Sequence, residues 1–320
     1  MSTDHISAVI CTRNRDDKIG TAVKSVLAND YESFDLTVID QSTTEATRRV
    51  VEPLAAADPR LRYVHVDEAG LSRAYNNGIG RTDGEILAFT DDDCIVAPDW
   101  LACIAKAFAS EPDGELLYGQ VLAAGPTADD MVKTPVLEIH DPQRLSRKDG
   151  FQVFGMGANF AARRSLFRAV GGFDTVLGGG GALRSSQDFD LAYRAYRGGR
   201  VILLRPDVAL RHDGRRETED WPALLTAYGT GDGAFYTKHV RCRDPYAFWL
   251  LTRRLVGYTA KWTVKSVVRR DKPAEIHYVR GMLKGIRGSF EFKVDRATRM
   301  YVDPTVSPAQ RRIDADRARS

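Results

Sequence analysis

Residues 86–93 read Ile86-Leu87-Ala88-Phe89-Thr90-Asp91-Asp92-Asp93, an apolar run of strand type that ends in three consecutive carboxylates. Three similar apolar runs precede it, and stretches with apolar residues at helical spacing lie between them. The expected strands span residues 6–12, 36–40, 61–66 and 86–90, and the expected helices span residues 18–28 and 45–56. This alternation predicts an α/β fold with a mostly parallel central sheet flanked by helices.

Three of the four expected strands run into polar or acidic residues. Thr12-Arg13-Asn14 ends the first strand, Asp40-Gln41-Ser42 the second, and the acidic run the fourth. The carboxyl ends of parallel strands share one edge of an open sheet, and ligands bind at that edge. The sequence therefore predicts a binding site there.

The acidic run has two interpretations. Three neighbouring carboxylates repel one another unless a cation or hydrogen-bond donors neutralise them. Mg²⁺ or Mn²⁺ would do so while coordinating phosphate oxygens, which implies a bound diphosphate. The alternative is an acidic turn before a helix near Pro98, with Asp93 or Asp99 as its N-cap. The run alone leaves both open.

A second acidic motif, Gln187-Asp188-Phe189-Asp190, lies near the start of an expected helix at residues 186–197. In the first turn, the helix dipole favours the ionised form of Asp188, as a general base requires. Ordinary capping by Ser185 or Ser186 with acidic first-turn residues explains the motif equally well. His212, at the end of an expected strand over residues 209–212, is by itself more often a core or surface histidine than a ligand.

The composition indicates a globular chain with a charge asymmetry. The 320 residues are 43% hydrophobic and 28% charged, which is not typical of disordered or disulfide-stapled chains. Residues 241–300 hold fifteen Lys and Arg against five Asp and Glu, which gives this segment a net charge of +10. The whole chain has a net charge of +3, so residues 1–240 are acidic overall. We expect a nucleotide-binding domain over residues 1–220, a basic amphipathic helical region over 221–300, and a polar, disordered tail over 301–320.

The basic region contains a helical stripe of apolar residues flanked by cations: Leu251, Leu255, Tyr258 and Trp262, with Arg254, Lys261 and Lys265. Such a helix can lie on an anionic membrane surface, or its stripe can pack against the globular domain. Nucleic acid is not an expected partner, because no nucleic-acid-binding motif accompanies the charge. Residues 111–150 read as an irregular insertion, apart from a strand signal at 116–120.

The cysteines and the hydrophobic runs bear on the compartment. The four cysteines show neither a C-x-x-C pair nor zinc-like spacing, which favours reduced thiols. The sequence shows no signal-peptide pattern and no apolar run long enough to span a bilayer. The expectation is a cytoplasmic protein, peripheral at the inner face of the plasma membrane if the basic region binds lipid.

The order of these motifs, over residues 5–240, resembles glycosyltransferase family 2, the inverting, nucleotide-sugar-dependent enzymes with the GT-A fold. The motifs that carry the resemblance are Val9-Ile10-Cys11-Thr12-Arg13-Asn14-Arg15, Val38-Ile39-Asp40-Gln41-Ser42, Gly70-Leu71-Ser72-Arg73-Ala74-Tyr75-Asn76-Asn77-Gly78, Asp91-Asp92-Asp93, Gly157-Ala158-Asn159-Phe160 with Arg163-Arg164, Gly171-Gly172-Phe173-Asp174, Gln187-Asp188-Phe189-Asp190-Leu191 and Arg211-His212. Each motif is loose alone, and their order makes the set specific.

The resemblance implies a role for each matching residue in the nucleotide pocket. Thr12 and Asn14 look like pocket residues after the first strand, and Asp40 is placed like the carboxylate that accepts a hydrogen bond from the base. Arg73 matches a position that contacts base or diphosphate, with Asn77 beside it.

The resemblance also implies a metal site and a base. Asp92 would contact the ribose and Asp93 the metal, with Asp91 in support. His212 corresponds to the histidine that completes the metal–diphosphate site, and Asp188 takes the position of the catalytic base. The implied cofactor is Mn²⁺ or Mg²⁺. The implied reaction moves a sugar from a nucleoside-diphosphate sugar, with UDP as the preferred nucleotide, to a glycan or lipid-linked acceptor hydroxyl.

The sequence departs from the family pattern at one position, and two alternative functions remain open. Many relatives have Glu where this chain has Gln187, and Asp190 is the fallback base if the loop register differs. The departure keeps open a membrane-docked nucleotide-sugar binding protein that has lost turnover. A sugar-phosphate nucleotidyltransferase is the other alternative, although its Gly-rich loop after the first strand is missing from residues 12–15.

Overall fold

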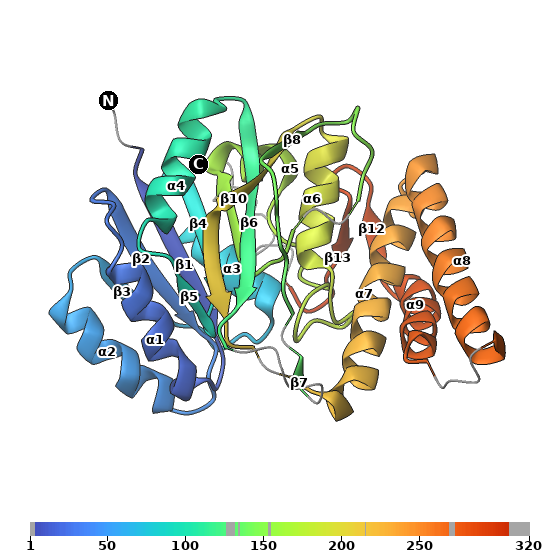
Figure 1. The fold of residues 1–320 in the computed structure, drawn as a ribbon, viewed down its shortest axis with the longest axis horizontal. Helices are drawn as coiled ribbons and strands as arrows, with labels where there is room; N and C mark the ends of the chain where they lie inside the picture. Colours follow the sequence, from blue (N-terminus) through green and yellow to red (C-terminus); the bar gives the residue numbers. More distant parts are fainter. Residues whose placement is uncertain are drawn as a thin grey trace.

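The computed structural model describes residues 4–125, 132–133, 135–152, 155–214, 216–268 and 273–306 of the 320 residues. Within this part, a nine-stranded mixed sheet forms the centre of the molecule (Figure 1). Its strands are β1 (Ile6–Thr12), β2 (Phe34–Asp40), β3 (Leu61–His65), β4 (Ile86–Asp91), β5 (Cys94–Val96), β6 (Gly114–Ala123), β8 (Gln143–Leu145), β9 (Asn159–Arg163) and β10 (Val201–His212).

The sheet is mostly parallel, as the sequence predicts. Its order is β3-β2-β1-β4-β9-β6-β10-β5, and β8 pairs with β10. β1 runs parallel to β2 and β4, β2 to β3, and β6 to β10. β9 lies antiparallel between β4 and β6, and β5 and β8 lie antiparallel to β10. The seven residues of β1 are all buried, which explains its continuous apolar sequence.

Helices cover both faces of the sheet. They are α1 (Asp16–Leu27), α2 (Ala46–Ala57), α3 (Leu71–Gly80), α4 (Trp100–Ser110), α5 (Arg164–Val170) and α6 (Gln187–Arg197). Alternate residues of β1 face opposite sides. Ile6, Ala8 and Ile10 belong to the core formed with α1, α2 and α4, and Val9 and Cys11 to the core formed with α3, α5 and α6.

Two expectations for the second half differ from the structure. Residues 116–120 lie inside β6, a ten-residue strand, and are not an isolated signal in an irregular insertion. The strand expected at 209–212 is the end of the longer strand β10, which begins at Val201 and whose pairing with β6 shifts register between Arg205 and Ala209. Outside the main sheet, two short strands pair with each other and a 3₁₀ turn follows them: β7 (Val132–Lys133), β11 (Arg216–Glu217) and η1 (Thr218–Asp220).

The region after residue 220 is helical, and it shares a core with the sheet. It contains α7 (Trp221–Arg241), α8 (Pro245–Val268) and α9 (Glu275–Ser289), followed by the hairpin of β12 (Lys293–Asp295) and β13 (Met300–Val302). Ala234 and Phe235 of α7 belong to the same hydrophobic cluster as Leu191 of α6. α8 lies at the outer side of this group (Figure 1).

The first residues of the segment expected as a disordered tail have defined structure. Tyr301 is buried, its backbone amide donates to Asp174 at 2.8 Å, and Asp303 accepts a 2.8 Å hydrogen bond from Arg73. Residues 301–306 therefore differ from the expectation. Residues 307–320 lie outside the described residues.

Candidate functional site

One edge of the sheet collects the polar ends of its strands. β1, β2, β4, β6 and β10 run in the same direction, so their carboxyl ends share this edge. Thr12, Asp40, Asp91 and His212 are the last residues of four of these strands. β9 runs the opposite way, so it begins at this edge with Asn159, which pairs with Thr90.

The acidic run is buried at the end of β4 and contacts β1 and α3. Thr12 Oγ1 donates to Asp92 Oδ2 at 2.7 Å, and the Tyr75 hydroxyl donates to Asp91 Oδ1 at 3.4 Å. Burial raises the pKa of Asp91 to about 7 and that of Asp92 to about 6, and the charge of Asp93 adds to both effects. The local repulsion expected from the sequence is therefore present in the fold.

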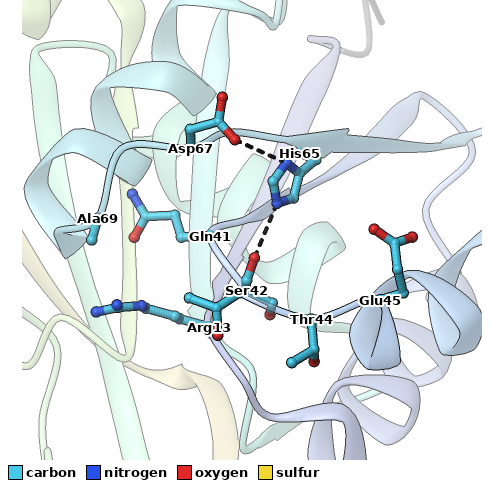
Figure 2. A pocket seen from close by; sticks show the side chains of 9 residues that line it. Arg13, Gln41, Ser42, Thr44, Glu45, His65, Asp67 and Ala69 are labelled. Carbon is cyan, nitrogen blue, oxygen red and sulfur yellow. Dashed lines mark hydrogen bonds and ion pairs between the residues drawn. The ribbon is translucent and has the colours of Figure 1, made fainter.

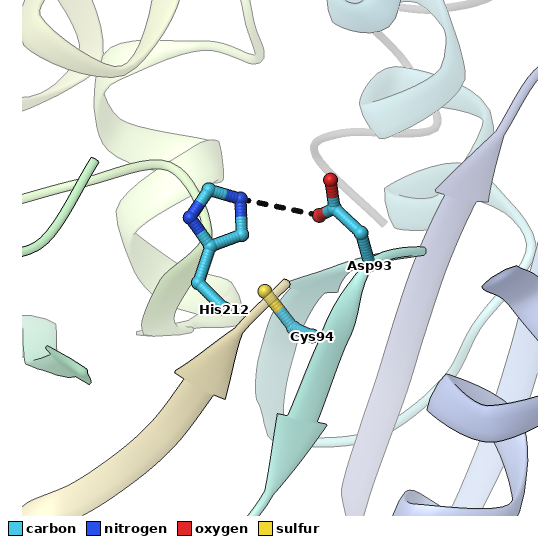
Figure 3. Close-up of side chains that lie close together, drawn as sticks. All are labelled: Asp93, Cys94 and His212. Carbon is cyan, nitrogen blue, oxygen red and sulfur yellow. Dashed lines mark ion pairs between the residues drawn. The ribbon is translucent and has the colours of Figure 1, made fainter. Parts of the chain in front are cut away.

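Asp93 lies beside His212 and Cys94 (Figure 3). β5 pairs antiparallel with the end of β10, which puts Cys94 opposite His212 and Asp93 directly next to the pair. The His212 Nε2 atom is 3.3 Å from Asp93 Oδ1. One ligand atom from each of the three residues lies within 4.8 Å of the others. Two residues that are 119 positions apart in sequence thus meet through strand pairing.

The geometry of His212 and Asp93 fits a divalent cation. His212 Nδ1 is 3.0 Å from the carbonyl of Pro135, and a carbonyl only accepts, so a neutral imidazole keeps its proton on Nδ1. Although burial lowers the pKa of His212, the hydrogen bond to Asp93 and its charge raise it, so in the absence of metal Nε2 donates a proton toward Asp93. On binding a cation, Nε2 would release this proton and offer its lone pair, as in histidines that bind metals. Burial alone would raise the pKa of Asp93, but His212 and Arg15 lower it to about 2, so this carboxylate is ionised. Carboxylates are the usual ligands of Mg²⁺ and Mn²⁺.

Two basic residues at the start of α1, Arg15 and Lys18, contact the acidic run and the residue after His212. Neither was assigned a role from the sequence. The guanidinium of Arg15 donates to Asp93 Oδ2, and its Nε is 3.5 Å from Asp92 Oδ1. Lys18, one turn further on, pairs with Asp213, whose backbone amide donates to the Asp93 carbonyl at 2.8 Å. Arg15 could have been noted from the sequence, because it directly follows the polar end of β1.

Asp188 lies in the first turn of α6 and faces the start of β9. Its Oδ2 accepts a hydrogen bond from the Gly157 amide at 3.0 Å, and its Oδ1 one from the Phe189 amide at 2.9 Å. Burial raises the pKa of Asp188 to about 6, although both amides act in the opposite direction. The Tyr75 hydroxyl lies 3.4 Å from the Gly157 carbonyl and 3.4 Å from Asp91 Oδ1, and its single proton can go to either acceptor. A chain of contacts therefore links the two acidic motifs, from Asp188 through Gly157 and Tyr75 to Asp91.

Asp190, the fallback base, forms buried ion pairs and hydrogen bonds with other side chains. It is fully buried and accepts from Arg194 at 2.9 Å, from Lys238 at 2.7 Å and from His239 at 2.9 Å. These partners come from α6 and α7 and leave it no surface. Asp190 has a structural role, and its burial among these partners does not suit the fallback role of base.

Past the end of β2 lies a hollow of about 330 Å³ (Figure 2). It is lined by Arg13, Gln41, Ser42, Thr43, Thr44, Glu45, His65, Asp67 and Ala69. Asp40 sits behind it with no exposed surface, and accepts from the Ser42 amide at 2.8 Å and from the Tyr63 hydroxyl at 2.7 Å. Asn14 Oδ1 accepts from the Thr43 amide at 2.9 Å. Asn14 and Asp40 thus shape the hollow through its loop.

Arg73 and Asn77, on α3, contact neither the acidic run nor Asp188. Arg73 pairs with Asp303 at 2.8 Å and with Glu68 at 3.4 Å. Asn77 donates to the Arg73 carbonyl at 3.0 Å and accepts from Arg81 at 3.3 Å. Of the residues predicted to form the site, Thr12, Asp91, Asp92, Asp93 and His212 are joined directly, and Asp188 through Tyr75 and Gly157.

In the part of the chain that the structure covers, no helix combines the length and the apolarity that a bilayer span requires.

The comparison with known sequences gives a family and several distant relatives. The model of the family described as "Glycosyl transferase family 2" matches residues 7–171. A glucosyl-dolichyl phosphate glucuronosyltransferase of Haloferax volcanii is 26% identical over 54% of this chain and 57% of its own length. A Campylobacter jejuni GalNAc(5)-diNAcBac-PP-undecaprenol beta-1,3-glucosyltransferase is 30% identical over 28% of this chain and 29% of its own. The chain thus spans less than two thirds of the length of these curated relatives.

Solved structures share the fold. The mannosyltransferase PcManGT from Pyrobaculum calidifontis, in complex with GDP-Man and Mn²⁺, has a TM-score of 0.60 at 17% identity, over 88% of this chain and 87% of its own. TarS 1-349 from S. aureus, in complex with UDP-GlcNAc, has a TM-score of 0.56 at 15% identity, over 98% of this chain and 89% of its own. Both likenesses agree with the GT-A fold implied by the motif order. Because the family model matches a little over half of the 320 residues, this chain belongs to glycosyl transferase family 2.

Proposed function

We propose that the protein transfers a sugar from a nucleoside-diphosphate sugar to an acceptor hydroxyl, with inversion at the anomeric carbon. The observation that carries this proposal is the chain of contacts between the acidic run at the end of β4 and Asp188 at the start of α6. Asp91 and Asp188 are joined through the hydroxyl of Tyr75 and the backbone of Gly157. The acidic run would hold a divalent cation that binds the departing diphosphate, and Asp188 would receive the proton of the acceptor.

Asp93 and His212 would hold a Mn²⁺ or Mg²⁺ ion, and Asp91 and Asp92 would support that charge. When bound, the cation stabilises the negative charge that grows on the departing diphosphate. Asp93 is suited to this role because it stays ionised in its buried position. The solved PcManGT structure contains Mn²⁺ with GDP-Man, which supports the same arrangement here.

Asp188 would act as the general base. A base works best when its pKa lies near the operating pH, and burial raises that of Asp188 to about 6. Its two amide donors fix the orientation of the carboxylate before an acceptor arrives. Deprotonation of an acceptor that attacks opposite the leaving diphosphate gives a product with inverted configuration.

The hollow past β2 would take the base of the nucleotide. Asp40 and Asn14 would shape it, and Thr12 would orient Asp92 toward the ribose. We assign UDP as the preferred nucleotide, in line with the sequence resemblance. TarS binds UDP-GlcNAc and PcManGT binds GDP-Man, so the direct competitor is GDP.

The test measures release of nucleoside diphosphate from a panel of UDP- and GDP-sugars with Mn²⁺ and a lipid-linked or glycan acceptor. Turnover should require metal and should be lost in Asp93→Ala. Asp113→Asn is the matched control, because Asp113 lies exposed in the turn before β6, at the opposite edge of the sheet. Full activity of Asp93→Ala without metal would overturn the metal assignment. Donor binding with no product from any acceptor would favour the binding-protein alternative raised by Gln187.

We further propose a lipid-linked acceptor and contact with an anionic membrane through α8. The outer side of α8 exposes Phe248, Trp249, Val256, Val264 and Val267 to between 51% and 71%. These residues lie in a region with a net charge of +10, and an apolar face within basic surroundings suits a bilayer with anionic headgroups. The names of the Haloferax and Campylobacter relatives include lipid-linked sugars.

Sedimentation with vesicles tests the membrane proposal. The full chain should pellet with phosphatidylserine-containing vesicles more than with neutral ones, and Val256→Glu with Val264→Glu should abolish the difference. Thr21→Glu, an exposed position on α1, is the control for added charge. Equal pelleting of wild type and the α8 variant would remove the proposal.

A further inference from the structure

Arg15 fills the place beside Asp93 where a divalent cation would bind. Asp93 has both oxygens in use, with Oδ1 3.3 Å from His212 Nε2 and Oδ2 bonded to the Arg15 guanidinium. The same guanidinium is 3.5 Å from Asp92 Oδ1, while Thr12 binds the other oxygen of Asp92. Arg15 therefore bridges the carboxylates of Asp92 and Asp93.

This position of Arg15 conflicts with a bound metal ion. A cation shared by Asp93 and His212 would lie within about 2 Å of its ligand atoms, next to the guanidinium. The two positive charges would repel each other in a site where water screens little. The carboxylates of Asp92 and Asp93 are largely buried, with 12% and 5% of their side chains exposed.

Arg15 has an anchored backbone and a partly exposed side chain. Its carbonyl accepts hydrogen bonds from the amides of Lys18 and Ile19, which anchors its backbone at the start of α1. Its side chain is 32% exposed and held by the two carboxylates. A diphosphate bound with the metal would offer it a new anionic partner, because a guanidinium binds two phosphate oxygens at once.

We propose that Arg15 is a tethered cation that neutralises Asp92 and Asp93 in the empty protein and shifts onto the diphosphate when metal and nucleotide bind. The inference rests on the proposed function and adds to it a coupling mechanism. Metal alone must displace Arg15 without compensation, whereas metal with a nucleoside diphosphate gives it a second site. Each ligand then raises the affinity of the other by the same factor.

The test is a titration of Mn²⁺, followed by the paramagnetic resonance signal of the free ion, with and without UDP or GDP. Wild type should bind Mn²⁺ weakly alone and at least about tenfold more tightly with the nucleotide, within the usual range of coupling. Arg15→Gln should bind Mn²⁺ alone about tenfold more tightly than wild type, bind the nucleotide more weakly, and show reduced coupling. Arg15→Lys keeps the positive charge but lacks the paired N–H donors of the guanidinium. This variant should keep the weak binding of Mn²⁺ alone.

Lys18→Gln is the matched control, because Lys18 lies one turn away on the same helix and pairs with Asp213. It should leave the coupling within twofold of wild type. Unchanged Mn²⁺ affinity and coupling in Arg15→Gln, with a metal site that Asp93→Ala abolishes, would overturn the role of Arg15 and leave the proposed function intact. No Mn²⁺ binding by wild type under any condition would overturn the metal assignment and this inference with it.

Discussion

Asp188 and Asp190 stand two residues apart in the first turn of α6 and have opposite electrostatic surroundings. Asp188 contacts two backbone amides, and burial raises its pKa to about 6. Asp190 is buried too, but Lys238, Arg194 and His239 hold its pKa well below the ordinary range. The pair separates into a group that can exchange a proton near neutral pH and a group that stays ionised.

This difference predicts the pH dependence of the reaction. A general base must be ionised, so kcat/KM should rise with pH and reach half its maximum near pH 6, the pKa of Asp188. Asp188→Asn should lower kcat by about 10²- to 10⁴-fold, the usual contribution of a general base. Nucleotide affinity, measured by thermal shift, should stay within twofold. A variant that retains the activity and the pH profile of wild type would contradict the assignment.

A second prediction concerns the buried cation of α7. Lys238 Nζ lies 2.6 Å from Asp174 and 2.7 Å from Asp190, and all three side chains are fully buried. Lys238→Met leaves two buried carboxylates facing each other, which should cost about 3–5 kcal/mol of unfolding free energy. Asp190 keeps Arg194 and His239, whereas Asp174, whose pKa burial already raises, loses its cation. The pKa of Asp174 should rise further in the variant, so this acid destabilises the fold most when it is ionised. The deficit should therefore be smaller at pH 5 than at pH 8.

Urea unfolding at both pH values measures this deficit. Lys261→Met, at an exposed position of α8, removes the same charge and should change the free energy of unfolding by less than about 1 kcal/mol. A loss for Lys238→Met that is equally small would mean that the buried carboxylates find other partners.

Among secondary structure elements, the contact between α7 and α9 depends on glycine. A Cβ on Gly285 would lie 2.0 Å from the Thr230 carbonyl, and one on Gly233 would lie 2.2 Å from the Met282 carbonyl. The two helix backbones thus approach each other where only hydrogen fits. The glycine-rich run at 229–233 therefore has a packing role.

Alanine at these positions should separate packing from helix propensity. Gly285→Ala forces the backbone of α7 away, and overpacking of this kind costs about 1–3 kcal/mol or more. Gly257→Ala on α8 meets nothing within 4 Å and should stabilise by about 0.5–1 kcal/mol, because alanine is the better helix former. Urea unfolding of both variants checks the prediction. Two stabilised variants would show that α9 is not held against α7 in solution.

The elements that sequence patterns predicted best are those whose signal is local. β1 is reproduced residue for residue and α1 to within two residues at its start, because apolar periodicity decides both. The length of β6 and the continuity of β10 were missed, because their register depends on partners far away in sequence.

The contacts of the candidate site also depend on residues that are far apart in the sequence. Asp93 and His212 were placed together through a family resemblance, and no local pattern links two residues 119 positions apart. The ion pair of Arg73 with Asp303 spans 230 positions and joins α3 to the end of the hairpin. Such a partner cannot be read from residues near Arg73, and the role expected for Arg73 came from the family resemblance.

At the scale of the molecule, the helical region after residue 220 is part of the structure that carries the site. Asp232 of α7 accepts a 2.7 Å hydrogen bond from Ser186, directly before α6, and pairs with Arg254 of α8 at 2.8 Å. Ser186 has a left-handed backbone, with φ of 69°, a conformation that needs support from its surroundings. The helices thus hold the turn that presents Asp188.

This connection predicts that the chain unfolds as one cooperative unit. α7 supplies Ala234 and Phe235 to the core beneath α6, and Lys238 neutralises Asp174 and Asp190. A chain that ends at residue 220 would expose apolar surface, take the cation from Asp174 and leave Asp190 with Arg194 alone. Such a fragment should lack near-ultraviolet circular dichroism and bind a hydrophobic dye, as compact states without fixed packing do. In the full chain, tryptophan fluorescence and far-ultraviolet dichroism should report one coincident transition. Two separated transitions, or a fragment with native dichroism, would mean that residues 221–306 form an independent unit and that Asp188 is positioned without them.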